Sequence, residues 1–204
     1  GTLQATLEWS AIATDPVTQE LLWSYSYSQA DGSSTTLNFR VNPDTLAFEV
    51  TGTGTWIDLE TQVTYSMNFT MDFPADGGFT MTMDVEGDDS TSLHEEFGMS
   101  ADGMLITILL IFTDATGYSL TNNYSIDFLT STVEYGFSDS EGYTGELILY
   151  ADGSGEGWVN DPNGDRIATI DIAAGGSPMT IKYRDGTTDV ISRSMSRVLK
   201  MLKR

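Results

Sequence analysis

Apolar and polar residues alternate along most of this chain. From residue 3 to residue 11, every second position holds Leu, Ala, Leu, Trp or Ala, and the same period returns in residues 21–27 and 37–41. Side chains two residues apart point to the same side of a β-strand, so this pattern predicts strands with one apolar face. With 40% hydrophobic residues in 204, we expect an all-β protein whose apolar faces form one core.

Short segments rich in glycine separate the alternating runs. The triplet Ala-Asp-Gly occurs four times, ending at Gly32, Gly77, Gly103 and Gly153. Asp-Gly favours tight hairpins because glycine adopts the positive φ angles that these turns require. The flanking sequences do not match one another, which indicates repeated turn chemistry and not a solenoid repeat. The spacing predicts a single-domain antiparallel up-and-down meander of about fourteen strands over residues 1–191.

The way in which so many strands would close is left open by the sequence. A large twisted sheet tends to curl or to split into packed layers, so a barrel, a half-barrel and a sandwich all fit. Residues 104–112 are almost entirely apolar on both faces, which predicts an inner strand.

Residues 192–204 follow a different period. From residue 191 on, apolar residues recur at helical spacing: Ile191, Met195, Val198, Leu199 and Leu202. Cations recur on nearly the opposite side: Arg193, Arg197, Lys200 and Arg204. We expect a basic amphipathic helix packed on the β domain. Docking of this helix on a partner or a membrane surface is the alternative.

The charge is strongly acidic and unevenly distributed. Residues 1–165 hold 27 acids and one base, Arg40, whereas residues 166–204 hold 3 acids and 8 bases, which together give the net charge of −21. Nucleic acid is not an expected partner, because its binding needs cations that neutralise phosphates. No run of 18 apolar residues and no secretory signal is present, so we expect no membrane span.

Methionine and phenylalanine form two stripes on either side of a predicted hairpin near Pro74. Four of these residues alternate before the turn and three after it: Met67, Phe69, Met71 and Phe73, then Phe79, Met81 and Met83. Because Met is flexible and polarizable, a Met/Phe surface fits varied apolar ligands, although it also fills irregular cores. These seven residues are the predicted binding site for a hydrophobic small molecule or a protein partner.

Catalytic and metal-binding motifs are absent from the sequence. The single histidine, His94, is beside Glu95 and Glu96, which would raise its pKa, but no nucleophile is tied to it by a motif. Two loops have alternating oxygen ligands suited to calcium, yet neither completes an EF-hand. They are Asp152, Ser154 and Glu156, and Asp161, Asn163 and Asp165. We therefore predict no catalytic residue, metal or cofactor.

The function that fits best is a non-catalytic binding or structural protein of an extracytoplasmic compartment. The compartment follows from abundant Ser, Thr, Gly and Tyr and scarce Lys. A carbohydrate-active enzyme is the first alternative, because paired carboxylates hydrolyse glycosides and four tryptophans could stack on sugars: Trp9, Trp23, Trp56 and Trp158. A surface or adhesive module is the second, and the oligomeric state stays open.

Overall fold

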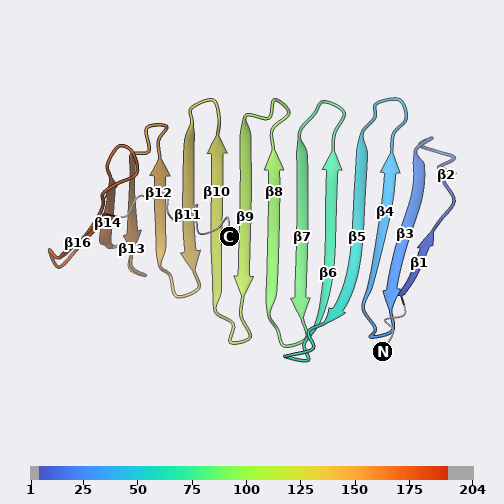
Figure 1. Ribbon diagram of the computed structural model, residues 1–204, viewed down its shortest axis with the longest axis horizontal. Coiled ribbons are helices and arrows are strands. Elements are labelled where there is room, and N and C mark those ends of the chain that lie inside the picture. Colours follow the sequence, from blue (N-terminus) through green and yellow to red (C-terminus); the bar gives the residue numbers. More distant parts are fainter. Residues whose placement is uncertain (1–4, 193–204) are drawn as a thin grey trace. The chain divides into compact units, whose positions relative to one another are not determined.

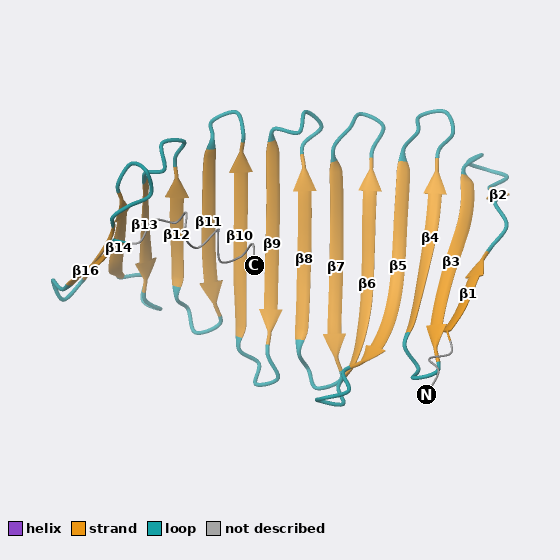
Figure 2. Cartoon of the chain, viewed as in Figure 1, coloured by secondary structure: helices purple, strands orange, loops and turns teal. Residues whose placement is uncertain are grey.

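The computed structural model describes residues 5–192, and every element in them is a β-strand (Figures 1 and 2). The chain divides into two compact units, residues 1–104 with 108–119 and residues 105–107 with 120–204.

Unit 1 is an antiparallel meander in which each strand pairs with the next one in the chain. The one exception is β1, which pairs with β3, while the two-residue β2 pairs with the start of β3. Its strands are β1 (Ala5–Trp9), β2 (Ala13–Thr14), β3 (Leu21–Gln29), β4 (Ser34–Val41), β5 (Phe48–Ile57), β6 (Thr64–Phe73), β7 (Phe79–Gly87), β8 (Ser92–Met99) and most of β9 (Leu105–Thr113).

Unit 2 continues in the same way. Its strands are β10 (Ser119–Asp127), β11 (Thr132–Asp139), β12 (Thr144–Leu149), β13 (Gly155–Asn160), β14 (Arg166–Ile172), β15 (Met179–Tyr183) and β16 (Thr188–Ile191). One irregularity in register lies between Val159 and Asn160, where β13 pairs with β14.

The predicted antiparallel meander is confirmed, with sixteen strands in place of about fourteen. Short strands such as β2 carry too few residues to show a period. Residues 104–112 form an inner strand as expected, since β9 lies between β8 and β10 in the strand order.

Of the three arrangements that the sequence left open, the closed barrel and the two-sheet sandwich are excluded. Over residues 5–192 the strands belong to one sheet whose order ends at β1 and at β16, so the sheet is open. Barrel closure needs a stagger between successive strands. Short hairpins here keep the strand ends aligned, with Phe48 opposite Phe73 and Phe79 opposite Met99.

Turn chemistry behaves as the sequence predicts. All four glycines of the Ala-Asp-Gly triplets have positive φ angles, between 70° and 94°. In three of these turns the aspartate Oδ1 accepts a hydrogen bond from the backbone N–H two residues later, at 2.9–3.0 Å: Asp31, Asp102 and Asp152. Each turn thus satisfies its own polar groups locally.

The expected filled core is wrong. Among the described residues the buried apolar side chains are Val50, Ala168 and Ile172. Most strand residues are half-buried, because they pack against neighbours on the same face and no second layer of described residues covers them. The helix predicted for residues 192–204, and its packing, lie outside the described residues except for Ser192, which follows β16.

Candidate functional site

The seven Met and Phe residues predicted as a binding site lie together on one face of unit 1. Met71 is opposite Met81 and Phe69 is opposite Met83 in the pairing of β6 with β7. The rings of Phe73 and Phe79 lie 4.7 Å apart between centroids. We call this side of strands β3–β8 the apolar face. The structure brings the seven residues together, and ligand binding by them stays a prediction.

Aromatic rings extend the apolar face across six strands. Successive centroids lie 4.7–6.2 Å apart along a row in which each ring contacts the next: Trp23, Phe39, Phe48, Phe73, Phe79 and Phe97. A row that crosses the strands ties the hairpins together, because each cross-strand aromatic pair stabilises the sheet.

Two glycines of β5 are part of the apolar face. Gly52 lies opposite Phe69, and a Cβ placed at Gly52 would collide with the Phe69 ring. Gly54 likewise lies under the end of Met67. The larger side chains of β6 therefore cover the bare backbone of β5, which explains why Gly52 and Gly54 are buried in a sheet without a second layer.

Large apolar side chains at the margin of this face are exposed to solvent. Trp9 and Leu7, which pair with Tyr25 and Tyr27, are 67% and 60% exposed, and Phe73 is 36% exposed. Over residues 5–192 no helix and no second sheet covers the face. An extended apolar surface of this kind is typical of an interaction site.

One carboxylate stands within the apolar face. Glu95 lies opposite Met83 in the pairing of β7 with β8, on the same side as Phe97. It is half-buried, and its carboxylate has no hydrogen bond or ion pair to the described part of the chain. The sequence shows Glu95 only as a neighbour of His94; its place on the apolar face follows from the strand register.

The opposite side of unit 1, the polar face, carries serine, threonine and charged residues. A hollow of about 470 Å³ on this face lies between the segment after β1 and strands β3–β5, and Arg40 and Glu49 line it. The Arg40 guanidinium lies 3.6 Å from the carboxylates of both Glu20 and Glu49. The one base in residues 1–165 is thus already neutralised by two acids.

His94 also lies on the polar face, between two carboxylates. Its Nδ1 is 2.6 Å from Asp84 Oδ1, and its Nε2 is 3.1 Å from Glu96 Oε1. The pKa of His94 is raised above its usual 6.5, first by the hydrogen bond between its ring and Asp84 and second by the one with Glu96. A carboxylate beside each ring nitrogen favours the doubly protonated, charged form of the ring.

Replacing Asp84 with asparagine is expected to lower the pKa of His94, as measured by an NMR titration of its ring protons. Because the folded pKa exceeds the unfolded one, the charged ring stabilises the fold fully below about pH 6.5. This contribution is lost as the pH rises through the folded pKa. Asp72→Asn, on the same face, serves as the control, and an unchanged pKa in Asp84→Asn would contradict the assignment.

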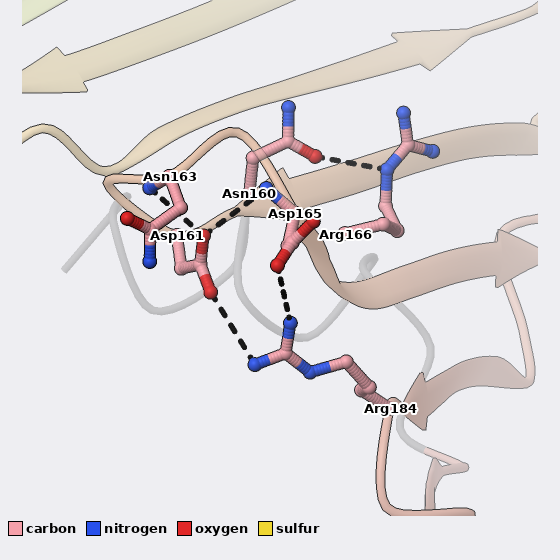
Figure 3. A network of polar contacts seen from close by, with 6 residues as sticks. All are labelled: Asn160, Asp161, Asn163, Asp165, Arg166 and Arg184. Carbon is pink, nitrogen blue, oxygen red and sulfur yellow. Dashed lines mark hydrogen bonds and ion pairs between the residues drawn. The ribbon is translucent and has the colours of Figure 1, made fainter.

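The acidic loop of Asp161, Asn163 and Asp165 in unit 2 faces a cation of the chain itself (Figure 3). Arg184 binds Asp161 Oδ2 and Asp165 Oδ2 at 3.3 Å each. Asp161 Oδ1 accepts hydrogen bonds from the N–H groups of Asn163 and Asp165. The carboxylates that suggested a calcium ligand set are therefore used by a hairpin turn and a guanidinium.

The second candidate calcium loop is also committed to local contacts. Asp152 Oδ1 accepts hydrogen bonds from the N–H and the hydroxyl of Ser154, at 2.9 and 2.6 Å. Glu156 Oε1 instead accepts one from Tyr150 Oη, at 2.8 Å. In residues 5–192 no cluster of three His, Asp or Glu side chains is arranged to hold a metal ion.

Of the four tryptophans, Trp158 alone lies beside described hollows in unit 2. A hollow of about 320 Å³ is lined by Trp158, Glu134, Glu146 and Asn123, and an adjoining one of about 240 Å³ also borders Trp158 and Glu146. Trp9, Trp23 and Trp56 belong to the apolar face of unit 1, where register pairs them with Tyr25, Phe39 and Tyr65.

Within residues 5–192 no helix is long and apolar enough to cross a membrane. No protein-family model matches the chain, and no curated protein matches it either.

Proposed function

We propose that the protein is a non-catalytic binding protein whose apolar face docks a protein partner with an apolar surface and basic residues. The open apolar face of unit 1 is the observation that carries the proposal. Five strand spacings of about 4.8 Å make it roughly 24 Å wide between β3 and β8, which suits a macromolecular surface better than one small ligand.

The charge around this face favours a basic partner. Hairpin turns at both ends of the strands carry acids, among them Asp31, Asp44, Asp58, Asp76 and Asp102, and residues 1–165 hold a single base. Glu95 adds a carboxylate within the apolar surface that has no ion-pair partner in residues 5–192. A cation of the partner would pair with Glu95, and cations at its margin would meet the acidic turns.

A second copy of this chain fits the same surface less well. Each copy carries a net charge of −21, so two acidic rims would meet across the interface. Like charges brought together oppose association unless salt screens them.

A synthetic amphipathic helix of leucine and lysine serves as the probe, with titration calorimetry as the measurement. We expect it to bind the wild-type chain, and Phe73→Glu to weaken binding at least tenfold. Thr70→Glu is the matched control, because Thr70 is exposed on the polar face of the same strand and the added charge is identical. Glu95→Gln is expected to weaken the binding of this cationic peptide but not the binding of an analogue in which glutamine replaces lysine.

Three results would overturn the proposal. The first is equal loss of binding in Phe73→Glu and Thr70→Glu, each verified as folded by circular dichroism. The second is a stable dimer in sedimentation together with no peptide binding, which would assign the face to a second copy. The third is tight binding of a free fatty acid without binding of the peptide, which would assign it to a small apolar ligand.

A further inference from the structure

We propose that the two hollows beside Trp158 in unit 2 form a binding site for a neutral oligosaccharide. The site is separate from the apolar face of unit 1 and does not depend on the function proposed for it. Its residues come from strands β10–β14 alone.

The strand register builds the site as a row across the sheet. Asn123, Gly136, Glu146 and Trp158 are successive cross-strand partners from β10 to β13. Gly136 has no side chain, and a Cβ there would lie 2.5 Å from the Asn123 Oδ1 atom. The Asn123 amide therefore covers the backbone of Gly136, and both residues line the hollow of about 320 Å³.

Polar groups that have no hydrogen-bond partner within residues 5–192 surround this hollow. The side chains of Asn123, Glu134 and Glu146 make no hydrogen bond or ion pair to another described residue. By contrast, Glu156 binds Tyr150, and Asp171 binds Lys182 at 2.7 Å. The three free groups offer carboxylate and amide oxygens to sugar hydroxyls, and bonds to ionised acceptors are the stronger kind.

Trp158 supplies the apolar platform that a sugar ring requires. Trp158 lines both hollows, so one tryptophan borders two neighbouring positions for sugar rings. Arg166 lies over the indole with its guanidinium carbon 4.7 Å from the ring centroid, and Arg166 Nε donates to Asn160 Oδ1 at 3.0 Å. This contact fixes the orientation of the indole before a ligand arrives.

The same contact bears on the charge of the ligand. Arg166 already occupies the cation–π position over Trp158, so a basic side chain of a ligand would have to displace it from the ring. The C–H face of a pyranose is uncharged and needs no such displacement, while its hydroxyls reach Glu134, Glu146 and Asn123. Shallow concave sites with an aromatic wall and a few polar groups are typical of small-ligand binding.

The spacing of Glu134 and Glu146 suits hydrogen bonds to a single sugar ring. Glu134 is opposite Ile148 and Glu146 is opposite Gly136, so the glutamates are diagonal neighbours on β11 and β12. Diagonal neighbours lie about 7–8 Å apart between Cα atoms. Both carboxylates can therefore bind hydroxyls of the same sugar ring.

The test is titration of the full chain with neutral hexasaccharides of glucose, xylose, mannose and N-acetylglucosamine. Tryptophan fluorescence and calorimetry measure the binding. We expect at least one hexasaccharide to bind in the micromolar to millimolar range, unchanged between 0.05 and 0.5 M NaCl, as for an uncharged ligand. Trp158→Ala should weaken this binding at least tenfold, and Glu146→Gln several-fold.

Trp9→Ala is the matched control, since Trp9 is a more exposed tryptophan of unit 1 and lines none of these hollows. Trp158→Tyr keeps an aromatic platform and should retain part of the affinity, which guards against loss of folding in Trp158→Ala. Absence of binding by all four hexasaccharides at millimolar concentration would overturn the proposal. So would binding of hexalysine that depends on Trp158, weakens with salt and exceeds the binding of every sugar.

Discussion

Replacing Phe69 with alanine is expected to lower the free energy of unfolding by about 2 kcal/mol, roughly half the loss for a fully buried phenylalanine. Phe69 is half-buried between Gly52 and Met83, and its ring covers the backbone of β5. Alanine would remove both the cross-strand packing and the cover over Gly52. Urea denaturation followed by tryptophan fluorescence measures the change.

A control and a double variant make this expectation specific. Thr70→Ala, exposed on the polar face of the same strand, should change stability by less than about 0.5 kcal/mol. Gly52→Ala should destabilise the wild-type chain, because its Cβ collides with the Phe69 ring, but stabilise the Phe69→Ala variant. Additive effects of the two substitutions would show that the ring does not cover this glycine.

Raising NaCl from 0.02 to 1 M at pH 7 is expected to stabilise the chain by about 3 kcal/mol, or roughly 10 °C in melting temperature for a chain of this size. Like charges face each other across neighbouring strands, with Glu49 opposite Asp72 and Glu156 opposite Asp171. Arg40 and Lys182 offset these pairs only in part. Salt screens the remaining repulsion.

The same scan near pH 4 separates screening from a general effect of salt on apolar groups. Acidification reduces the negative charge of the chain, so the stabilisation by NaCl should be smaller near pH 4 than at pH 7. An equal rise in melting temperature at both pH values would show that the stabilisation comes from strengthened apolar contacts and not from acidic repulsion.

Both expected changes in stability follow from the difference between the apolar face and the polar face of unit 1. Packing within the sheet is confined to the apolar face, where the aromatic row and the Met/Phe pairs bury one another's surfaces. The polar face carries the ion pairs of Arg40 and the hydrogen bonds of His94. Without a second layer of described residues, stability depends on cross-strand neighbours, and the same exposure leaves the apolar face open to a partner.

Several features of the candidate site follow from local sequence. The two-residue period places Met67, Phe69, Met71 and Phe73 on one side of β6, and the turn at Gly77 brings β7 back beside them. Hairpin turns fix the pairing of adjacent strands, so a stripe on each strand predicts a two-strand patch. The patch predicted for these seven residues is the one observed.

Other features depend on pairings that no local pattern encodes. The hollow beside Gly136 forms only because Asn123 and Glu146 lie on the two flanking strands. Asp161 and Asp165 are neutralised by Arg184, which lies two strands further along. Periodicity assigns each residue to a face of the sheet. It does not say which residues of more distant strands lie in the same cross-strand row.

The sequence by itself determined the strands, the turn chemistry, the two-sided character of the sheet and its acidity, because these depend on residues within one hairpin. Only the tertiary structure decided that the sheet of residues 5–192 stays open, that its apolar face has no cover among them, and where Glu95 and Trp158 lie. Closure and covering depend on whether distant strands meet, and the free energies of the alternative arrangements differ through long-range contacts that a two-residue period does not specify.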